Sequence, residues 1–416
     1  MHPNLRHPET IPSVTVSTPN LTVRAGHPDF LELPWEVSLE DWDIPELVDL
    51  PKGISRHTVR FVSFPQGIYA IKELNERAAR HEYAILRELE ELAAPAVHAV
   101  GLVTGRSPDR HDERSAALIT AYENFSFSYR ELLEGPGFGQ NRSRMLNAFA
   151  FLLVRLHLLG VFWGDCSLSN VLYRWDADSL ETIMVDAETA SIHPGGLSDG
   201  QRQEDLQIMV ENVAGGVSDI AAMAGTEPAP EDLAMGLEIA ERYEGLWSEL
   251  ADEETIGPDE RYKIGEKMAR INALGFDVEE VELVPTNSDS EEFQFKLKLG
   301  GRTFHSNRLR DLTGVEALEN QARVILSDLY YFQAKEGAQD TPTKKNVSAI
   351  KWRVTEFEPM IERLRHIEGV NDPIQAYCDL LHHRYLMATE QQRDVSTLEA
   401  FEHWLAEGRP GYPPPP

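Results

Sequence analysis

Cysteine is scarce in this chain of 416 residues, which contains only Cys166 and Cys378. Two cysteines cannot build the disulfide framework that stabilises many secreted domains, so a reducing cytoplasm fits best. The sequence also lacks any run of about 18 apolar residues, the length that a membrane-spanning helix needs. Its first residues are polar and proline-rich, without the apolar core of a secretory signal. We therefore expect a cytoplasmic protein with no membrane span.

Positive charge is the second scarcity, because 39 Lys and Arg face 69 Asp and Glu and give a formal net charge of −30. Nucleic acid and anionic membrane surfaces would be repelled by such a field, so neither is expected as a partner. A nucleotide is still compatible with this charge, since one local lysine and a Mg²⁺ ion can meet its phosphates. The one basic cluster, Lys344-Lys345 with Lys351–Arg353, indicates either a solvated helix face or a site for an anionic substrate or partner.

The hydrophobic content of 42% and charged content of 26% are typical of a globular protein, and the length exceeds that of one average domain. Alternating and helical apolar patterns predict two strands around a Pro65–Gly67 turn, a helix over 75–92 and two further strands. An apolar helix over 142–159 follows, then a hairpin of strands and a helix over 204–220. Residues 224–232, AGTEPAPED, have the composition of a linker.

Three polar residues around the predicted hairpin carry the strongest chemical signal. Asp165 lies in the sequence VFWGDCSLSN, Asn170 follows five residues later, and Asp186 follows the hairpin. Asp165 is suited to face a hydroxyl that attacks a phosphoryl group, while Asn170 and Asp186 supply the hard oxygen ligands that Mg²⁺ prefers. Phosphoryl transfer depends mostly on positioning and charge neutralisation, so a few residues of this kind suffice.

A lysine and a glutamate upstream add to the candidate site residues Asp165, Asn170 and Asp186. Tyr69-Ala70-Ile71-Lys72 resembles the V-A-I-K strand of kinases, and Glu82 opens a helical E-x-x-I-L-x-x-L pattern like that of the kinase αC helix. The resemblance implies that Lys72 touches the α- and β-phosphates, that Glu82 holds Lys72, and that Ala70 leaves room for adenine. The backbone of Ala121, Tyr122 and Glu123 resembles the kinase hinge that bonds the adenine edge.

The glycine-rich loop of kinases is nearly absent. The corresponding stretch, LPKGISRH, contains one glycine, Gly53, where kinases have G-x-G-x-x-G. Gly53, Ser55 and nearby backbone amides either cover the phosphates or form a plain turn between strands.

Residues from about 50 to 220 thus resemble the protein-kinase-like superfamily, nearest to its atypical bacterial branch of lipopolysaccharide-kinase-like and aminoglycoside-phosphotransferase-like enzymes. The chain departs from protein kinases at two motifs. Trp163-Gly164-Asp165 replaces H-R-D, and Asp186-Ala187-Glu188 replaces D-F-G. Glu188 is either a further Mg²⁺ ligand or a solvated carboxylate. Asp205 resembles the helix aspartate that braces the catalytic-loop backbone, and His157 and Cys166 are expected to be buried structural residues.

The resulting fold class is α+β, with a bilobal protein-kinase-like fold followed by a mainly α-helical C-terminal domain that contains a β-hairpin. The C-terminal region resembles an uncharacterised domain found next to such lobes, which implies no activity. We expect a flexible N-terminal segment over 1–29 and a kinase-like domain over 30–223, with a small lobe over about 30–122 and a large lobe over about 123–223. A mainly helical C-terminal domain over 233–409 and a disordered tail over 410–416 follow.

The expected function is transfer of a phosphoryl group from ATP, with Mg²⁺, to a hydroxyl of a small molecule, sugar or protein. Trp-Gly-Asp is closer to the H-G-D of small-molecule kinases and favours a small acceptor. Two alternatives are compatible with the same residues. One is a nucleotide-binding pseudokinase that acts as a scaffold or regulator through its C-terminal domain. The other is nucleotidyl transfer on the same fold.

Overall fold

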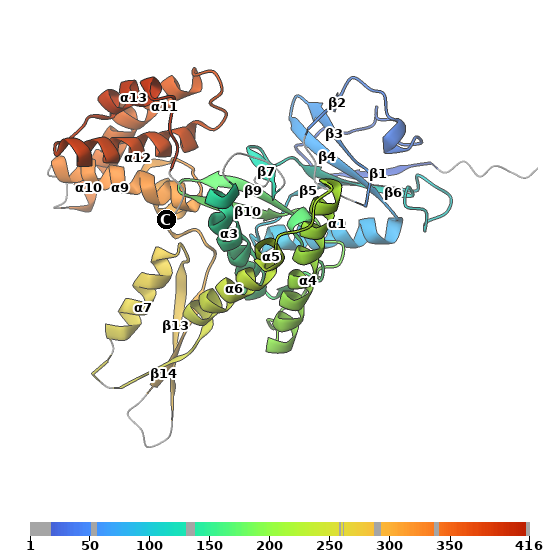
Figure 1. Ribbon diagram of the computed structural model, residues 1–416, viewed down its shortest axis with the longest axis horizontal. Helices are drawn as coiled ribbons and strands as arrows, with labels where there is room; N and C mark the ends of the chain where they lie inside the picture. Colours follow the sequence, from blue (N-terminus) through green and yellow to red (C-terminus); the bar gives the residue numbers. More distant parts are fainter. Residues whose placement is uncertain are drawn as a thin grey trace, which may run out of the picture. The chain divides into compact units, whose positions relative to one another are not determined.

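The computed structural model describes residues 18–50, 56–129, 138–257, 259–260, 262–286, 293–336 and 341–412 (Figure 1). Contacts divide the chain into two compact units. The first unit holds the residues up to Glu90 together with Val97–Tyr122, and the second holds Glu91–Ala96 and the chain from Glu123 onward. Each unit is described by itself.

The first unit is built on a six-stranded sheet of order β1-β5-β6-β4-β3-β2. Its strands, in chain order, are β1 (Asn20–Val23), β2 (Leu47–Val48), β3 (Val59–Phe64), β4 (Gly67–Leu74), β5 (Ala99–Thr104) and β6 (Ala116–Ala121). Strands β3 and β4 confirm the two strands predicted around the Pro65–Gly67 turn, and β5 and β6 confirm the two further strands. The central position of β4 fixes Lys72 between Val59 of β3 and Leu118 of β6.

Helix α1 (Glu76–Glu91) confirms the helix expected over 75–92. Its buried residues include Ala79, Leu86 and Leu89, which the 3.6-residue period had placed on one face. Glu82 lies among these buried positions although it is charged. A carboxylate at such a position needs a compensating partner.

The acidic stretch after residue 30 is packed more tightly than its composition suggests. Phe30, Trp35 and Trp42 are buried against sheet residues, in one core with strands β3 to β6. The Arg106 guanidinium lies 2.7 Å from the buried Glu73 carboxylate and also donates to the carbonyl oxygens of Trp35 and Val37. This buried ion pair ties the stretch to the sheet, because the same guanidinium that pairs with Glu73 also bonds the backbone of the stretch.

The N-terminal segment predicted to be flexible, 1–29, contains a short strand at residues 20–23. These form β1, which pairs antiparallel with β5 from Asn20 opposite Thr104 to Val23 opposite Gly101. The alternating Leu21 and Val23 pack against the core, which explains why this short run is held as an edge strand. Residues 1–17 lie outside the described part of the chain.

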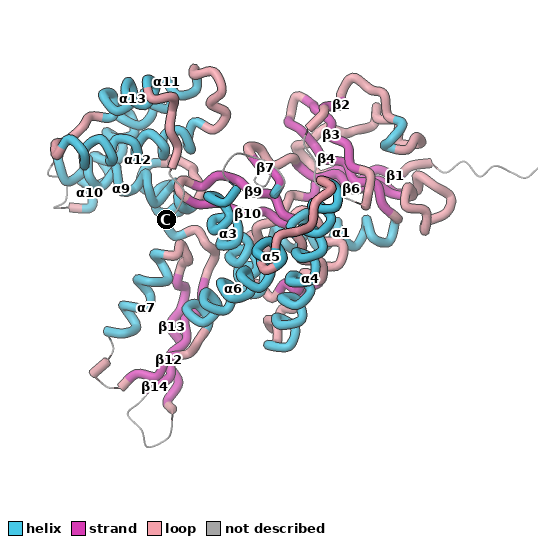
Figure 2. Tube along the Cα trace, in the orientation of Figure 1, coloured by secondary structure: helices cyan, strands magenta, loops and turns pink. Residues whose placement is uncertain are grey.

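The second unit begins with small sheets around two long helices (Figure 2). The strands are β7 (Ser126–Ser128), β8 (Val161–Phe162), β9 (Val171–Asp176), β10 (Ser179–Met184) and β11 (Ser191–Ile192). The helices are α3 (Phe138–Leu158) and α4 (Asp199–Met223). The hairpin β9–β10 and both helices were expected, whereas β7, β8 and β11 are too short to leave a periodic signal.

The predicted linker over 224–232 contains the one-turn helix α5 (Pro230–Leu233), and helix α6 (Met235–Ala251) follows it. The sequence assigns α6 to the C-terminal domain, but α6 packs against α3 and α4. Arg142 of α3 makes a bidentate ion pair with Glu238 of α6, at 2.6 and 2.7 Å. The Cα of Val210 lies so close to Gly236 that a Cβ there would come within 2.8 Å of it.

The C-terminal part contains a three-stranded sheet and a group of helices. The sheet comprises β12 (Glu254–Ile256), β13 (Val278–Pro285) and β14 (Phe293–Leu299) in the order β12-β14-β13. The helices are α7 (Tyr262–Ala273), α8 (Phe304–Thr313), α9 (Glu319–Lys335), α10 (Pro342–Trp352), α11 (Glu358–Arg365), α12 (Pro373–Gln391) and α13 (Thr397–Ala406). This confirms a mainly helical region with a β-hairpin and the α+β class. None of the helices in the described ranges combines the length and apolar character that crossing a bilayer requires.

Two polar junctions join this helical group to the β9–β10 hairpin within the second unit. The buried Asp176 carboxylate accepts hydrogen bonds from the backbone N–H groups of Asn320 and Gln321 at the start of α9. Arg302 lies 3.1 Å from Glu181, which also pairs with Arg155. A carboxylate at a helix N-terminus is favourable, and removing one partner of a buried ion pair would leave an uncompensated charge.

The predicted disordered tail 410–416 is wrong for its first residues. Trp404 Nε1 donates to the Pro410 carbonyl oxygen, and the Tyr412 hydroxyl donates to the Cys378 carbonyl oxygen. The Tyr412 ring also stacks on His382 at 4.4 Å between ring centroids. Residues 413–416 lie outside the described part.

Asp379, beside this docked tail, should make stability depend on pH. Burial raises its pKa to about 7, so the folded state holds the proton more tightly than the unfolded state, and its stabilising contribution is lost as pH rises from about 4 to 7. We expect Asp379→Asn to increase the free energy of unfolding, measured in urea, more at pH 8 than at pH 5. The exposed Glu362→Gln is the matched control. An equal gain at both pH values would contradict the assignment.

Candidate functional site

Lys72 and Glu82 form the ion pair that the sequence predicted, within the first unit. Lys72 Nζ lies 2.8 and 2.7 Å from the two Glu82 carboxylate oxygens. The Glu82 side chain is fully buried and that of Lys72 is 13% exposed. The central strand β4 and the buried face of α1 supply the two residues, so the ammonium is held in place although its four-carbon stem is flexible.

The residues expected to contact adenine lie on β4 and at the end of β6. Ala70 is half-buried, opposite Thr120 of β6. The backbone N–H groups of Ala121 and Tyr122 donate to the carbonyl oxygens of His98 and Ile68. Those two N–H groups are therefore already bonded within the sheet, and the expected adenine contacts of this backbone stay a prediction for its other polar groups. Gly53 and Ser55 fall outside the described residues.

Asp165 and Asn170 meet in the second unit. Asn170 Nδ2 donates to the Asp165 backbone oxygen at 3.0 Å and to Oδ2 of its carboxylate at 3.1 Å. A short 3₁₀ helix, Leu168–Asn170, turns the chain back so that the side chain of Asn170 reaches residue 165. The amide nitrogen of Asn170 is committed to Asp165, so only its Oδ1 atom can serve as a metal ligand.

Asp186 follows β10 on the chain that leads away from the hairpin. Its Oδ1 accepts the backbone N–H of Glu188 at 3.0 Å, and its carbonyl oxygen accepts Nε1–H of Trp163 at 2.8 Å. The adjoining Val185 N–H donates to the Asn170 carbonyl oxygen at 3.0 Å. These contacts fix the backbone of the Asp-Ala-Glu motif against the loop that carries Asp165. Asp186 and Glu188 are both half-exposed.

Asp205 of α4 braces this loop, as the resemblance implied. Its carboxylate accepts the backbone N–H groups of Trp163 and Gly164, both at 2.8 Å, and Nε2–H of His157 at 3.0 Å. Burial alone would raise the pKa of Asp205, but these hydrogen bonds outweigh burial and lower the pKa below its ordinary value. The carboxylate is therefore ionised and holds the loop as a fixed anion.

The structural roles expected for His157 and Cys166 are confirmed. His157 is 2% exposed, and its Nδ1 lies 2.7 Å from the Tyr243 hydroxyl of α6. Cys166 donates from Sγ to Asp205 at 3.2 Å. Burial and the neighbouring Asp205 carboxylate raise the pKa of Cys166 well above its ordinary value, so the thiol stays neutral and unreactive.

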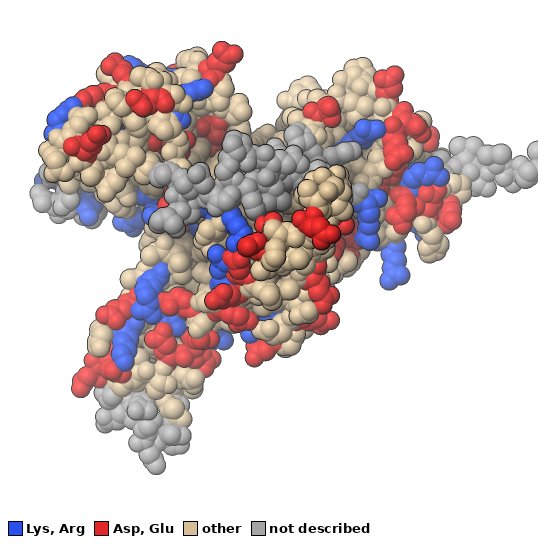
Figure 3. Space-filling model, viewed as in Figure 1, with Lys and Arg blue, Asp and Glu red and all other residues tan. Residues whose placement is uncertain are grey.

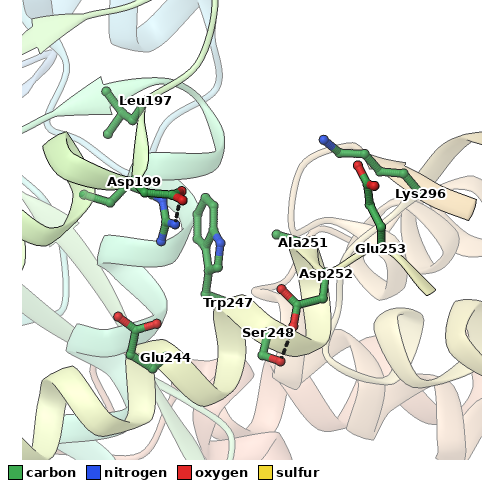
Figure 4. Close-up of a pocket in the computed structure, with 10 residues that line it drawn as sticks. Leu197, Asp199, Glu244, Trp247, Ser248, Ala251, Asp252, Glu253 and Lys296 are labelled. Atoms are coloured by element: carbon green, nitrogen blue, oxygen red, sulfur yellow. Dashed lines mark hydrogen bonds and ion pairs between the residues drawn. The ribbon is translucent and has the colours of Figure 1, made fainter. Parts of the chain in front are cut away.

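The hydrogen bonds that run from Asp205 through His157 to Tyr243 lead to an open cavity of about 620 Å³ (Figure 4). Arg202 lines it, donates to the Tyr243 hydroxyl, and lies 4.0 Å from the centroid of the Trp247 ring. Figure 4 shows Trp247 beside Asp199, with Glu244 on the same helix as Trp247 and Asp252 just after the end of that helix. Lys296 of β14 closes the opposite wall. The cavity is polar. Its lining residue Arg202 is linked by hydrogen bonds through Tyr243 and His157 to Asp205.

The segment after Asp186 is tied down by backbone contacts. Strand β11 pairs with β8, Thr189 Oγ1 donates to the Trp163 carbonyl oxygen, and the His193 N–H donates to the Gly160 carbonyl oxygen. Gly160 has a φ of +76°, and a Cβ there would lie 2.3 Å from the His193 oxygen, so only glycine fits. The loop and this segment are therefore held in one arrangement.

We accordingly expect that no phosphorylation of the chain is needed for activity. Gly164 stands where protein kinases carry the Arg that gathers an activation phosphate, and a guanidinium is the usual bidentate phosphate binder. The test is turnover before and after phosphatase treatment, with intact mass to show that phosphate is gone. Equal rates are expected. A large loss that rephosphorylation restores would show that the segment is a switch.

The residues present fit a nucleotide-bound Mg²⁺ ion better than an all-protein metal cage. Within the described ranges, no group of three or more His, Cys, Asp or Glu side chains is arranged to hold a metal. Mg²⁺ is usually held by one or two carboxylates together with substrate phosphates and water. Asn170 and Asp186 offer one amide oxygen and one carboxylate, which suits that mode.

The sequence analysis missed two residues of the site. Asn212 of α4 donates from Nδ2 to Oδ1 of Asp165 at 2.9 Å, and Tyr243 of α6 supports His157. A signal existed for Asn212, because it lies seven residues after Asp205 and so on the same helix face. No local pattern marks Tyr243, whose contact depends on how α6 packs.

The charge distribution is mixed. In the view of Figure 3, basic side chains lie among acidic ones on every part of the visible face. Of the expected basic cluster, Lys351 pairs with Glu336 at 2.6 Å and Arg353 pairs with Glu358 at 2.7 Å. Both side chains are partly exposed and paired, which is typical of a solvated helix face.

Comparison with known proteins finds a family match over the C-terminal part of the chain. Residues 245–408 match the family described as "Domain of unknown function (DUF4032)". The solved structures that resemble the chain include one described as "WaaP in complex with acyl carrier protein", with 15% sequence identity and a TM-score of 0.32 over 55% of this chain and 88% of that one. No curated protein matches the sequence. The family match begins inside α6.

Proposed function

We propose that this chain is a phosphotransferase that uses ATP and Mg²⁺ to phosphorylate a hydroxyl group. One observation carries the proposal, namely the formation of both polar groupings that this chemistry needs. The first unit holds the Lys72–Glu82 ion pair, and the second holds Asp165 and Asn170 in mutual contact, with Asp186 fixed to the same loop. Burying polar and charged side chains in such groupings lowers stability, so their presence favours a functional site.

The proposed roles follow from the chemistry of each group. Lys72 binds the α- and β-phosphates as a point charge, and Glu82 keeps its ammonium oriented. Asp165 accepts the proton of the attacking hydroxyl, whose oxygen forms the new bond to phosphorus while the bond to ADP breaks. Asn170 Oδ1 and Asp186 would hold Mg²⁺, which when bound would supply positive charge beside the phosphates of ATP. Glu188 is either a further ligand or a solvated carboxylate.

The proposal gives adenine a different set of contacts from that of the kinase hinge. Because the N–H groups of Ala121 and Tyr122 are already bonded, the edge of adenine would be recognised by carbonyl oxygens of these residues and by Glu123. Ala70 would pack against the ring. Gly53 and Ser55 remain predicted phosphate contacts.

A small-molecule hydroxyl is the proposed acceptor class. The fixed segment after Asp186 and the glycine at position 164 leave no phosphate-dependent switch of the kind that controls many protein kinases. The motif Trp-Gly-Asp points the same way, because it is closer to the H-G-D of small-molecule kinases.

The deciding experiment is incubation of the purified protein with ATP and Mg²⁺ and a panel of sugars, other hydroxyl metabolites and the protein itself. Formation of ADP with a phosphorylated acceptor supports the proposal. Formation of AMP and pyrophosphate would show nucleotidyl transfer. Mg²⁺-dependent ATP binding without any turnover would identify a pseudokinase, and no binding would refute all three.

We expect Asp186→Asn to abolish the Mg²⁺-dependent part of ATP binding while leaving the fold intact. A ligand at about 100 times its dissociation constant stabilises a protein by about 2.7 kcal/mol, so the loss is measurable as a smaller thermal shift. Asp178→Asn is the matched control, because Asp178 lies in the neighbouring hairpin turn and is 46% exposed. A full Mg²⁺-dependent shift in the Asp186 variant would refute its role as a ligand.

A further inference from the structure

The turn of the β9–β10 hairpin is buried in the C-terminal helical region. The first residue of this turn, Ala177, is fully buried and belongs to the hydrophobic core that residues of α8 to α13 form. Its φ of +55° lies in the left-handed region, which a residue with a Cβ adopts rarely. A backbone conformation of this kind persists when the surrounding structure enforces it. The contacts around Ala177 should therefore fix the turn in place.

Gln375 of α12 supplies such contacts. Its Oε1 atom accepts the Ala177 N–H at 2.8 Å, and its Nε2 atom donates to the Ala177 carbonyl oxygen at 3.1 Å. Two further side chains hold Gln375 in turn. Gln321 Nε2 donates to its Oε1 atom at 3.2 Å, and its Nε2 atom donates to Asp379 at 2.9 Å. One side-chain amide thus satisfies both backbone groups of a buried residue that is 198 positions away.

Asp176, directly before the turn, is held by the same region. Its buried carboxylate accepts the backbone N–H groups of Asn320 at 3.1 Å and Gln321 at 2.8 Å, at the start of α9. Asp178, by contrast, pairs with Arg323 at the surface, where these side chains are 46% and 43% exposed, and such a pair contributes little to stability. Buried bonds from α9 and α12 therefore hold the turn.

The two arms of this hairpin end at the proposed Mg²⁺ ligands. The pairing of β9 with β10 runs over six residues of each strand and ends at Val171 and Met184. Asn170 immediately precedes the first arm, and Asp186 lies two residues after the second. The Val185 N–H donates to the Asn170 carbonyl oxygen, so the ladder continues to the site. Six residues at about 3.3 Å each place the turn roughly 20 Å from these two residues.

We propose that the C-terminal helical region is a positioning module for the phosphotransferase site and acts on it through the β9–β10 hairpin. This inference rests on the proposed function. The part of the chain that matches the uncharacterised family, 245–408, contains α9 and α12 and so supplies both sets of buried bonds to the turn. A displacement of α12 against α9 would move the turn, and the paired strands would pass that movement to Asn170 and Asp186. Gln375 is the main positioning residue of this module.

Two substitutions of Gln375 separate its hydrogen bonds from its volume. Gln375→Met keeps a side chain of similar length and removes both bonds to Ala177, whereas Gln375→Ala removes the volume as well. If Gln375 only fills space, the methionine variant should behave like the wild type. If its bonds position the hairpin, both variants should alter the site. Gln391→Ala is the matched control, because Gln391 is exposed at the end of the same helix.

The first measurement needs neither ATP nor a metal. Backbone amide hydrogen exchange of the full chain, followed by mass spectrometry, reports separately on the turn, on α12 and on the far ends of the hairpin, 168–172 and 184–188. We expect both Gln375 variants to speed exchange at the far ends by about fivefold, the effect of one lost hydrogen bond on a local opening equilibrium. Gln391→Ala should change none of these rates. Faster exchange confined to the turn and α12 would indicate a contact that only joins two parts of the chain, and would overturn the inference.

The second measurement tests the coupling from the opposite side, in the wild-type chain. Coupling between two sites is reciprocal, so binding of ATP with Mg²⁺ should slow exchange in the first turns of α9 and α12. Unchanged exchange in both helices would overturn the inference, even if the Gln375 variants failed to fold.

The third measurement is the Mg²⁺ dependence of ATP binding. In Gln375→Met, the Mg²⁺ concentration that gives half of the ATP-dependent thermal shift should rise about tenfold, while the shift with ATP alone stays the same. An equal loss of both shifts would indicate general destabilisation and would contradict a positioning role. Absence of ATP binding by the wild type would instead refute the proposed function, and the first measurement would still decide whether the C-terminal region positions the hairpin.

Discussion

Replacing Asp165 with alanine is expected to lower phosphoryl transfer by about 10²–10⁴-fold while ATP binding is retained. The side-chain amides of Asn170 and Asn212 donate to the carboxylate and hold it in place, and a neutral amide does not neutralise its charge. The metal and phosphate contacts proposed for Asp186 and Lys72 do not involve it. The measurement is steady-state turnover beside an ATP-dependent thermal shift.

Asp178→Ala provides the control for Asp165, because it removes a carboxylate from the adjoining hairpin without touching the loop. It should retain turnover within about twofold. If Asp165→Ala turned over like the wild type, Asp165 would not be the catalytic carboxylate. If the variant lost ATP binding as well, its role would lie with the nucleotide and not with the acceptor.

Asp205→Ala should cost about 3–5 kcal/mol of the free energy of unfolding. The substitution leaves the N–H groups of Trp163 and Gly164 and the Nε2–H of His157 without their acceptor in a fully buried position. Unpaired buried donors carry the full cost of lost hydration, whereas the native bonds only replace bonds to water. Urea denaturation at pH 7 measures the difference.

The matched control for Asp205 is Asp199→Ala on the same helix. Asp199 pairs with Arg202, three residues further along. Asp199 is 93% exposed, so its loss should change stability by no more than about 1 kcal/mol. A loss below about 1 kcal/mol for Asp205→Ala would show that water or another group takes over its bonds. Because the pKa of Asp205 is lowered, its contribution is present near neutral pH and is lost as pH falls through that lowered value.

Much of the first unit could be predicted because its signals are local. The two strands flank the Pro65–Gly67 turn, burial alternates along β4, and α1 carries a regular apolar face. Once Lys72 is placed on a central strand and Glu82 on the buried face of the next helix, their pairing requires only that the helix cover the sheet. The contact of Asp165 with Asn170 could also be predicted, since both residues lie on one short loop.

The remaining features depend on packing that no local pattern encodes. Two-residue strands such as β8 and β11 have no period, and the composition of 224–232 indicates a linker although α6 returns to pack on α3 and α4. The ordered stretch after residue 30 depends on the Arg106–Glu73 pair, which joins residues far apart in sequence. The spacing of Asn212 from Asp205 places both on one helix face, but only the path of α4 past the loop shows that Asn212 reaches Asp165.

The position of α6 also determines where the chain can be divided. The match to the uncharacterised family begins at residue 245, two residues after Tyr243, in the middle of a helix that ends at Ala251. A fragment started there would leave Tyr243 on the other piece, without the helical turns that hold its hydroxyl against His157 and its ring against Trp247. Both pieces would expose an apolar helix face, so proteins cut at this family boundary should be poorly soluble. Dividing the chain between Ala251 and Glu254, after the helix has ended, would keep α6 with the partners that need it.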